Sequence, residues 1–556
     1  MYLRALRIEN FRAIRKSALS FDDGTALIGE NDCGITSVLD ALELVLGFDE
    51  KSRRYPPWLF HRDLETGRPR GPIGIQLRFA ERHAGEWSGA EYEPFEALLP
   101  AAGKRPRELW YEARVSPAGA RDGEAEYRLR SPRIKARSSD PDLIGRFRRM
   151  NPVIRVPAGM LSGHGPARNW PDGREADGLK VSKEMRDLMA RINRAVNTRL
   201  SGRSLDLKSD LEDGYLAAFR LIEMGTIKMG KWEAGLTRSI SEIIGWRPDR
   251  KRSRNTTLLR DPDSDSERLG ILLLIGALIR ARPGGMAPDA DPLWIIEEPE
   301  AHLHPITLTS VAMFVSLIQR QKILTTYSGD LLSAVPLSQL RRLVRHDGEL
   351  HERRVRKNVL SRSELRRFHY HLRSRFPGVS FSRLWLLVEG ESEFWILPQL
   401  ASLMGYEFAL EGISCVEFAQ CGLMPPLKVA RELGIQWHLL ADGDDAGKAY
   451  IKAAGDFLDE DSRVTLLRHK DIERFFWDHG YSGVYERASK LSPQKLQKLS
   501  PGRIIQAAVR KTSKPYLALS IIEAIATDGS PGIPPRLEKM IESCVQLARE
   551  APERLA

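Results

Sequence analysis

The sequence predicts an α/β protein of several domains, and three observations support this class. Near the N-terminus an apolar strand, residues 25–29, runs into a glycine-containing loop and then an amphipathic helix. In the last third, short apolar strands at residues 384–388, 437–441 and 464–467 each lead into acidic residues. With 556 residues, the chain has room for about three domains, each with its own core. Strands that alternate with helices in this way favour parallel α/β sheets.

The composition points to a polyanionic partner. The chain has 85 Lys and Arg against 74 Asp and Glu, a net charge of +11, although a basic balance by itself is a weak indicator. No apolar run reaches the ~18 residues that cross a membrane, and no secretory signal is seen. The four cysteines form no zinc-type pairs, so we expect a reduced, cytoplasmic protein without a membrane partner.

The opening residues predict a strand, a basic turn and a second strand, and alternating stretches up to residue 134 predict further antiparallel strands. In the first loop, four residues separate Gly29 from Gly34, and Thr36 follows one residue later. This spacing is typical of a phosphate-binding loop, which directs backbone N–H groups and a helix N-terminus at phosphates. That pattern needs Lys after Gly34, and Ile35 stands there. The candidate nucleotide contacts are Gly29, Asn31, Gly34, Thr36 and Ser37. An ordinary strand–turn–helix without a ligand is the alternative.

A second indication of nucleotide binding is the apolar strand predicted at residues 293–296, which is followed directly by Glu297 and Glu298. In such an arrangement the first carboxylate helps to hold the water shell of magnesium, and the second polarises the attacking water. Glu297 is therefore a candidate cofactor ligand, and Glu298 is a candidate catalytic residue. ATP is the expected nucleotide, although Ile35 forfeits a charged hydrogen bond of about 1.5–3 kcal/mol.

The acidic clusters of the last third indicate a metal-dependent phosphoester site. Glu389 and Glu393 follow the first strand, Asp442 and Asp444 follow the second, and Glu473 lies close behind the third. The carboxyl ends of parallel strands converge on one crevice, so these side chains can share ions. Magnesium or manganese takes hard oxygen ligands, and two ions about 4 Å apart stabilise the attacking and leaving oxygens of a phosphoryl displacement. Solvated turns and helix caps are the plainer interpretation.

These motifs resemble known modules. The pattern E-G-x-x-E at residues 389–393, followed by D-x-D-x-x-G at residues 442–447, resembles the TOPRIM fold of topoisomerases, primases and OLD-family nucleases. The opening strand, with I-x-N-F-R at residues 8–12, resembles the N-terminal ATPase lobe of the OLD and SMC-related families. Across nearly the full chain, the order of parts resembles the class 2 branch of the OLD (overcoming lysogenization defect) ATP-dependent endonucleases.

The resemblance implies an ABC/SMC-like ATPase domain with a helical insertion, followed by a C-terminal TOPRIM domain. The expected boundaries are 1–165 for the N-terminal ATPase lobe, 166–255 for a helical insertion that mediates dimerisation, 256–380 for the C-terminal ATPase lobe and a basic bridge, and 381–556 for the TOPRIM domain with C-terminal helices. Ser264, with Glu267 and Arg268, resembles a degraded ATPase signature loop, for which an N-capped core helix is the alternative. Tyr327 stands where the family has a phosphate-contacting His. Together with Ile35, this implies impaired ATP hydrolysis.

For catalysis, the resemblance implies two-metal cleavage of DNA. Glu389, Glu393, Asp442, Asp444 and Glu473 would bind the ions, with Glu391, Asp445 and Asp471 as second choices. The family also places a functional lysine downstream of its acidic cluster, for which Lys514 is the candidate and Lys470 and Lys511 are alternatives. The candidate catalytic residues of this site are therefore Glu389, Asp442, Asp444 and Lys514. The expected partners are DNA, a second copy of the chain and an accessory protein, and the expected roles are antiphage defence or DNA repair.

One stretch and two further functions stay open. The segment 341–375 is dense in Arg and His, and it is either a solvated linker or a surface that neutralises a nucleic-acid backbone. A strand-passing or priming TOPRIM enzyme is one alternative, but strand passage needs a nucleophilic tyrosine on a winged-helix module, and no such region is found. A non-catalytic DNA-binding or regulatory ATPase relative is the other. It predicts that replacing the carboxylates leaves DNA binding and biological activity intact, whereas a nuclease loses cleavage.

Overall fold

A computed structural model describes residues 1–47, 54–158 and 290–551, with short gaps inside these ranges. The gaps are residues 64, 102, 120, 302, 306–307, 309–310, 313–314, 316–319, 376–377 and 459–462. The expected helical insertion and the segment around Ser264 therefore lie outside the described residues. The chain divides into two compact units, residues 1–352 and 353–556.

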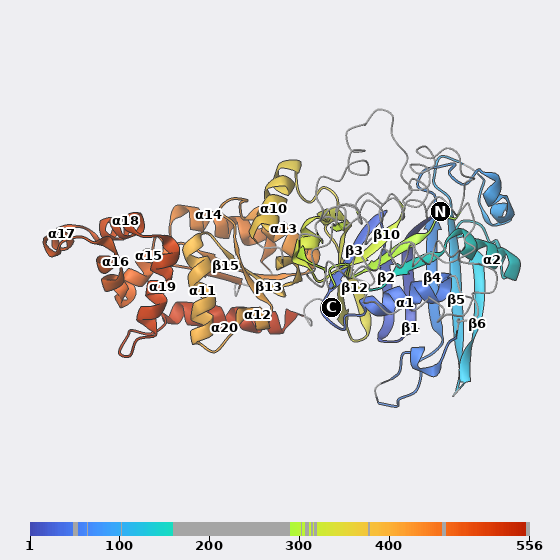
Figure 1. Ribbon diagram of the computed structural model, residues 1–556, viewed down its shortest axis with the longest axis horizontal. Helices are drawn as coiled ribbons and strands as arrows, with labels where there is room; N and C mark the ends of the chain where they lie inside the picture. Colours follow the sequence, from blue (N-terminus) through green and yellow to red (C-terminus); the bar gives the residue numbers. More distant parts are fainter. Residues whose placement is uncertain are drawn as a thin grey trace, which may run out of the picture. The chain divides into compact units, whose positions relative to one another are not determined.

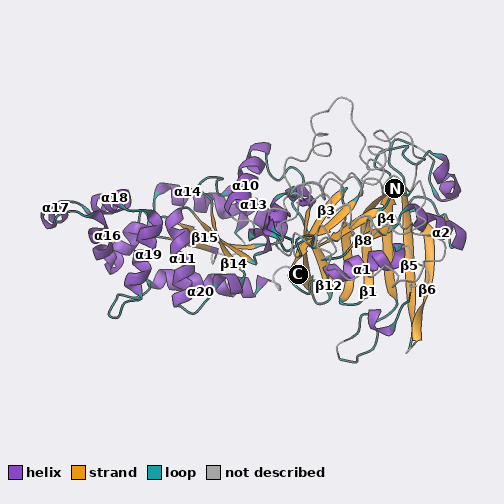
Figure 2. Cartoon of the chain, in the orientation of Figure 1, coloured by secondary structure: helices purple, strands orange, loops and turns teal. Residues whose placement is uncertain are grey.

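The first unit is built on one mixed sheet, which has twelve strands among the described residues in the order β7-β6-β5-β4-β1-β2-β12-β11-β3-β10-β9-β8. Figure 2 shows these strands side by side. They are β1 (Tyr2–Phe11), β2 (Ile14–Ser20), β3 (Gly24–Gly29), β4 (Ile73–Ala80), β5 (Glu108–Ala118), β6 (Arg121–Arg130), β7 (Arg137–Ser138), β8 (Val153–Val156), β9 (Leu293–Glu297), β10 (Lys322–Thr325), β11 (Leu340–His346) and β12 (Glu349–Arg353). The helices of this unit include α1 (Ile35–Leu46), α2 (Pro141–Met150) and α9 (Gly329–Ser333).

The antiparallel part of this sheet follows from alternating sequence. In β1, Leu6 and Ile8 are buried and Glu9 is exposed. The alternation of buried and exposed residues is interrupted between Leu3 and Leu6, because the register with β4 shifts between Leu3 and Ala5. β1 pairs antiparallel with β2 and β4, and β5 pairs antiparallel with β4 and β6. The antiparallel strands predicted between residue 1 and residue 134 are confirmed.

The parallel part of the sheet positions the nucleotide motifs. β3 is buried over most of its length between β10 and β11, as an apolar strand without alternation should be. α1 follows β3 and buries Val38 and Leu42 in the core of this unit. β3, β9 and β10 run in the same direction, so their carboxyl ends, which carry Gly29 and Glu297, lie at one edge. The predicted strand, loop and helix are confirmed.

The second unit is built on a four-stranded parallel sheet in the order β14-β13-β15-β16. Its strands are β13 (Leu384–Val388), β14 (Ile413–Glu417), β15 (Gln436–Ala441) and β16 (Val464–Leu466). Its helices are α10 (Arg362–Arg375), α11 (Glu391–Leu403), α12 (Phe408–Glu411), α13 (Met424–Leu433), α14 (Asp445–Ala454), α15 (Ile472–Phe476), α16 (Ser482–Ser489), α17 (Pro493–Lys498), α18 (Pro501–Lys511), α19 (Lys514–Ile525) and α20 (Pro535–Arg549).

Helices cover both faces of this sheet. Leu384, Leu386 and Val388 of β13 pack into a core that α11 and α20 complete. Figure 1 shows α10, α13 and α14 on the opposite side of the strands from α20. Trp385 alternates with Leu386 along β13, and its ring lies 6.3 Å from the ring of Phe368 of α10. Burial on both faces explains why these strands are short continuous apolar runs.

The strand order places the acidic motifs at a topological switch point. β13 lies between β14 and β15, so the chain leaves β13 to one side through α11 and later returns to its other side through α13. In open parallel sheets, the crevice at such a reversal is where ligands bind, outside the carboxyl ends of the strands. Glu389 follows β13 and Asp442 follows β15, so these two carboxylates flank the switch point.

The second unit begins at Arg353, earlier than the expected boundary at residue 381. α10 belongs to the second unit because it makes two contacts there. Phe368 packs against Trp385, and Glu364 forms a 2.9 Å ion pair with Lys428 of α13. The Arg- and His-rich stretch 341–375 is therefore not one continuous linker. Its first part forms strands of the first unit, and its last part forms a helix of the second.

All four cysteines, Cys33, Cys415, Cys421 and Cys544, are buried and free. Among the described residues, no helix combines the length and the apolar character needed to span a membrane.

Candidate active site

The acidic site is built from the carboxyl ends of β13 and β15. Glu389 is half-buried directly after β13, and its Oε2 atom is buried without a hydrogen-bond partner. Glu393 lies in the first turn of α11 and is only 5% exposed. A Cβ at Gly390 would lie 3.1 Å from Glu393 Oε2 and 3.9 Å from Lys514 Nζ. The carboxylate of Glu393 and the ammonium of Lys514 thus both lie against the backbone at Gly390.

The D-x-D-x-x-G motif forms a tight turn into α14. Asp444 caps the helix by accepting a 2.8 Å hydrogen bond from the backbone N–H of Gly447. A Cβ at Gly447 would lie 1.9 Å from the carbonyl oxygen of Asp442, so no side chain fits there. Gly443 donates a 2.7 Å hydrogen bond to the carbonyl of His469, and a Cβ on it would lie 2.4 Å from the carbonyl of Leu467. Glycine at both positions is therefore a packing requirement of the turn that holds Asp442.

Glu473 joins the site from α15. Its Oε1 atom accepts a 2.6 Å hydrogen bond from Ser392 Oγ and lies 3.8 Å from Lys514 Nζ. Ser392 belongs to α11 and Lys514 begins α19, so this one carboxylate links three helices at the acidic edge. The sequence analysis assigned no role to Ser392. Its place between Glu391 and Glu393 was the only available signal.

The carboxylates of this site raise one another's pKa. Burial, followed by the charges of Glu393 and Glu389, raises the pKa of Asp442 to about 8. Burial, and then the charge of Glu473, raises the pKa of Glu393 to about 7, while Lys514 lowers it. Burial and the charge of Asp444 likewise raise the pKa of Glu389. The site therefore gathers more negative charge than one lysine neutralises, which is the electrostatic condition for holding a cation.

The donor set suits a hard divalent cation. All five predicted ligands present carboxylate oxygens, which magnesium and manganese prefer, and Glu389 Oε2 is a buried acceptor without a partner. Within the described residues, no three Asp, Glu, His or Cys side chains are already grouped closely enough to coordinate an ion. Two of the carboxylates make other contacts, because Asp444 caps α14 and Glu473 contacts Ser392 and Lys514. Magnesium commonly keeps several waters and uses one or two carboxylates directly, which agrees with such a loose arrangement.

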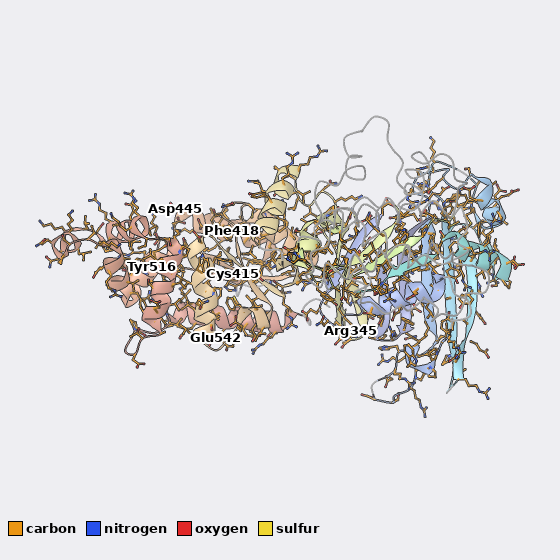
Figure 3. The ribbon with its side chains drawn as sticks, in the orientation of Figure 1. Arg345, Cys415, Phe418, Asp445, Tyr516 and Glu542 are labelled. Atoms are coloured by element: carbon orange, nitrogen blue, oxygen red, sulfur yellow. The ribbon has the colours of Figure 1, made fainter. Side chains whose placement is uncertain are left out.

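The second-choice residues differ in their surroundings. Asp445 is fully exposed and pairs with Lys448, and Figure 3 labels it on the helical surface of α14. Asp471 caps α15 by accepting a 2.7 Å hydrogen bond from the backbone N–H of Arg474, and its charge also raises the pKa of Asp442. Glu391 is half-buried. Lys470, Lys511 and Lys514 are all exposed, and Lys514 contacts the site carboxylate of Glu473.

The candidate nucleotide loop has the backbone of a tight glycine turn. Gly34 adopts a φ of 109° as the N-cap of α1, a conformation that favours glycine. A Cβ at Gly29 would lie 2.5 Å from Cys33 Sγ and 2.8 Å from the carbonyl of Leu343. Asn31 and Thr36 are exposed and Ser37 is buried. Ile35 is 8% exposed and belongs to the hydrophobic core of the unit, so this side chain packs inward.

Glu297 already has a cationic partner. Arg155 of β8 is a buried side chain that forms an ion pair with Glu297 and donates hydrogen bonds to Asp40 (2.6 Å) and Glu43 (2.7 Å) of α1. Arg12 also pairs with Asp40. Arg155 thus ties the carboxylate at the end of β9 to the side of α1. Arg155 lies 142 positions from Glu297, so no local pattern in the sequence points to this pair.

The loop after β9 and the loop after β10 are joined through Glu300. Its Oε1 atom accepts hydrogen bonds from Thr326 Oγ1 (2.7 Å) and from the backbone N–H of Tyr327 (2.7 Å). Tyr327 is 48% exposed. Glu298 has a φ of 39°, and burial followed by the charge of Glu300 raises its pKa. Glu298 and Tyr327 therefore lie on loops at the same edge as the glycine loop.

Comparison with known proteins gives the family. A family model described as "Protein of unknown function (DUF2813)" matches residues 1–378, about two thirds of the chain. The chain belongs to the DUF2813 family. A second model, "Overcoming lysogenization defect protein-like, TOPRIM domain", matches residues 381–444, which contain Glu389, Glu393, Asp442 and Asp444.

A relative of this DUF2813 protein extends over its whole length. The "Uncharacterized protein YbjD" of Escherichia coli (strain K12) is 32% identical over an alignment 580 positions long, which covers 99% of each chain. Among solved structures, the "SMC head domain from Thermotoga maritima" is 16% identical, covers 64% of this chain and 100% of that one, and gives a TM-score of 0.31. The "C-terminal region of the Burkholderia pseudomallei OLD protein" is 17% identical, covers 31% and 99%, and gives 0.26.

The predicted fold class is confirmed for the DUF2813 chain. The mixed sheet with its glycine loop lies within the DUF2813 match, and the parallel sheet with its acidic edge is the OLD-like TOPRIM domain. At these TM-scores the solved structures carry no argument of their own, so the fold rests on strand order and on the family models. The resemblance to the OLD family is also confirmed.

Proposed function

We propose that this DUF2813 protein is a DNA endonuclease that depends on magnesium or manganese and hydrolyses phosphodiester bonds at its TOPRIM site. The proposal is carried by the three carboxyl groups of Glu389, Glu393 and Asp442, which lie at the switch point of the parallel sheet and all have a raised pKa. Lys514 lies beside them. The match to the OLD-like TOPRIM model over these residues supports it.

In this proposal the ligands are Glu389, Glu393, Asp442, Asp444 and Glu473. Bound divalent cations supply Lewis-acid stabilisation of phosphate oxygens and lower the pKa of a water molecule. Lys514 contributes a fixed positive charge next to Glu473, where it stabilises negative charge that develops on the phosphate. Ser392 positions Glu473 through their 2.6 Å hydrogen bond, so the place of this carboxylate does not depend on Lys514 alone.

Plasmid cleavage tests this function. Purified protein with magnesium or manganese should nick or cut plasmid DNA, and Asp442→Asn should lower the rate by about 100-fold or more, because removal of a charge-stabilising group at a reacting centre costs about that factor. Asp445→Asn is the matched control, because that carboxylate is exposed and pairs with Lys448. Cleavage retained by Asp442→Asn would refute the proposal. Equal loss in both variants would show a nonspecific effect of charge.

We further propose that ATP hydrolysis in the first unit is impaired. Ile35 packs into the core where a phosphate-contacting lysine would be needed, and Tyr327 presents a phenol instead of an imidazole. Arg155 adds a third reason, because its ion pair neutralises Glu297. Glu298 is the proposed water-polarising residue, and Gly29, Asn31, Gly34, Thr36, Ser37 and Ser264 remain the proposed ATP contacts.

We also propose an oligomeric state, a partner and a biological role for this protein. The resemblance to OLD proteins implies a dimer formed through the ATPase part, an accessory protein, and a role in antiphage defence or DNA repair. The competing function is a DNA-binding or regulatory protein without catalysis, and the ion pair and hydrogen bond of Glu473 are the observation that favours it. That alternative predicts unchanged DNA binding and biological activity in Asp442→Asn and no cleavage by the wild-type protein with either metal.

A further inference from the structure

The helices after the TOPRIM core carry charge of a single sign. Residues 487–522 contain eight Lys and Arg and no Asp or Glu, and all eight side chains are exposed. They are Arg487, Lys490, Lys495, Lys498, Arg503, Arg510, Lys511 and Lys514. We call these residues the basic segment. A solvated helical surface ordinarily mixes both signs, so a run of this length indicates a polyanion-binding surface.

The basic segment is continuous with the acidic site. It begins at the end of α16 and continues through α17, α18 and the first turns of α19, and α16 packs against both α18 and α19. Figure 1 shows these four helices gathered at one end of the second unit. At the start of α19, Lys514 Nζ lies 3.8 Å from Glu473 Oε1. A polyanion that follows the basic segment would therefore arrive at the carboxylates.

Two exposed aromatic residues lie in the first turns of the two helices that begin at this acidic edge. Trp395 is 41% exposed and follows Glu393 by two residues on α11. Tyr516 is 56% exposed and follows Lys514 by two residues on α19, and Figure 3 labels its side chain. α11 and α19 pack against each other, and both begin at the acidic edge. Because a helix rises ~1.5 Å per residue, the backbone of Trp395 lies within about one turn of Glu393, and that of Tyr516 lies within about one turn of Lys514.

We propose that the basic segment, Trp395 and Tyr516 form a track for an unpaired DNA strand. The cations contact the phosphates, the two rings stack on bases, and the strand leads a phosphodiester to the acidic site. A duplex keeps its bases stacked on one another and offers few ring faces, so exposed aromatic side chains beside cations favour a single strand. This inference rests on the proposed nuclease function and specifies its substrate as unpaired DNA.

Binding by the full-length Asp442→Asn protein without divalent metal tests the track apart from cleavage. Fluorescence anisotropy of a labelled single strand and of the same sequence as a blunt duplex should show at least about tenfold tighter binding of the single strand. Trp395→Ala and Tyr516→Ala should each weaken single-strand binding by about tenfold, because stacking of one base on an aromatic ring has roughly this value. Tyr516→Phe retains the ring and should retain the affinity.

Two controls make the result specific. Tyr370→Ala removes a ring that is 72% exposed on the arginine-rich helix α10, and it should leave single-strand binding unchanged. A second variant replaces Lys495, Lys498 and Arg503 together by Gln. The slope of log K against log salt concentration should become about two units less negative, because each neutralised phosphate of a single strand contributes about −0.7 to this slope. A strand that runs along α10 would respond to Tyr370→Ala instead.

The track is overturned if the aromatic variants weaken single-strand and duplex binding equally, if they weaken neither, or if Tyr370→Ala has the larger effect. The nuclease function fails separately, through absence of plasmid cleavage by the wild-type protein. If the variants change single-strand binding as predicted but the wild type does not cleave DNA, the protein binds single strands without being a nuclease. Cleavage without the track behaviour would leave a nuclease that binds DNA elsewhere.

Discussion

Arg155 shows how a single residue determines what the first unit can do. Its buried guanidinium contacts Asp40, Glu43 and Glu297, three carboxylates from α1 and β9. A bound magnesium nucleotide would have to attract Glu297 away from this partner. Ile35 and Tyr327 weaken the same site from the glycine loop and from the loop after β10. The proposed weakness of ATP hydrolysis would therefore be the combined effect of three residues.

Restoring two of these residues should raise ATP hydrolysis. In Ile35→Lys combined with Tyr327→His, we expect about a tenfold higher rate of phosphate release, because a charge-assisted hydrogen bond to phosphate has a value of about 1.5–3 kcal/mol, part of which the Arg155 pair offsets. Adding Glu298→Gln should return the rate to background. A double variant that melts like the wild type and hydrolyses no faster would show that these positions are not the reason for the impairment.

His438 gives the second unit a pH-dependent stability. It is 1% exposed on β15, its Nε2 atom lies 2.9 Å from Thr465 Oγ1, and burial followed by the charge of Arg463 lowers its pKa to about 4. The unfolded chain has a His pKa near ~6.5 and so binds the proton first as the pH falls. The contribution of neutral His438 is complete above about pH 6.5 and is lost as the pH falls toward 4.

The His438→Gln variant isolates this contribution. Between pH 8 and pH 5, the wild type should lose about 2 kcal/mol of unfolding free energy that the variant does not lose. Urea unfolding at both pH values, followed by tryptophan fluorescence, gives the difference between the two proteins. Equal losses would mean that His438 is protonated in the folded state at pH 5.

At the scale of an element, the turn between β15 and α14 depends on a missing side chain. The carbonyl of Asp442 occupies the place of a Cβ at Gly447, at 1.9 Å, whereas a Cβ at Gly455 near the end of the same helix meets nothing within 4 Å. The first position therefore fixes the geometry of a candidate ligand, and the second only ends the helix.

These two glycines predict opposite effects. Gly447→Ala should destabilise the fold by about 2–3 kcal/mol, as overpacking of a tight site does, and should lower metal-dependent cleavage. Gly455→Ala should be neutral or should stabilise by up to about 1 kcal/mol, because alanine reduces the entropy of the unfolded chain. Thermal unfolding of both variants, with plasmid cleavage at a permissive temperature, measures this contrast. Similar behaviour of the two would contradict the packing of the turn.

At the scale of the whole molecule, one chain combines two compact units with different chemistry. The first holds a glycine loop whose acidic partner is neutralised, and the second holds a carboxylate cluster with an excess of negative charge. The match of the YbjD relative over 99% of both chains spans both units.

The proposed dimer is a prediction at this scale. Light scattering coupled to gel filtration should give the mass of two chains for the wild type. Asp442→Asn should give the same mass, because the proposed interface lies in the ATPase part and the substitution lies in the second unit. A monomer at micromolar concentration would contradict the resemblance on which the dimer rests.

The sequence by itself determined the local elements and their order. The alternation in β1, the apolar runs of β13 and β15 and the glycine loop before α1 were all predicted, because hydrophobic periodicity and turn residues act over a few positions. The placement of Glu389 and Asp442 at one edge also followed, since carboxyl ends of parallel strands converge.

Only the tertiary structure decided which distant groups meet. Ser392 contacts Glu473 across 81 positions, and Arg155 contacts Glu297 across 142. It also decided that residues 353–380 belong to the second unit, because Phe368 of α10 packs beside Trp385. Such contacts depend on strand order and helix packing, which join segments that no local pattern connects. The physical reason is that periodicity reports which side of an element is buried, whereas the partner is set by the whole chain.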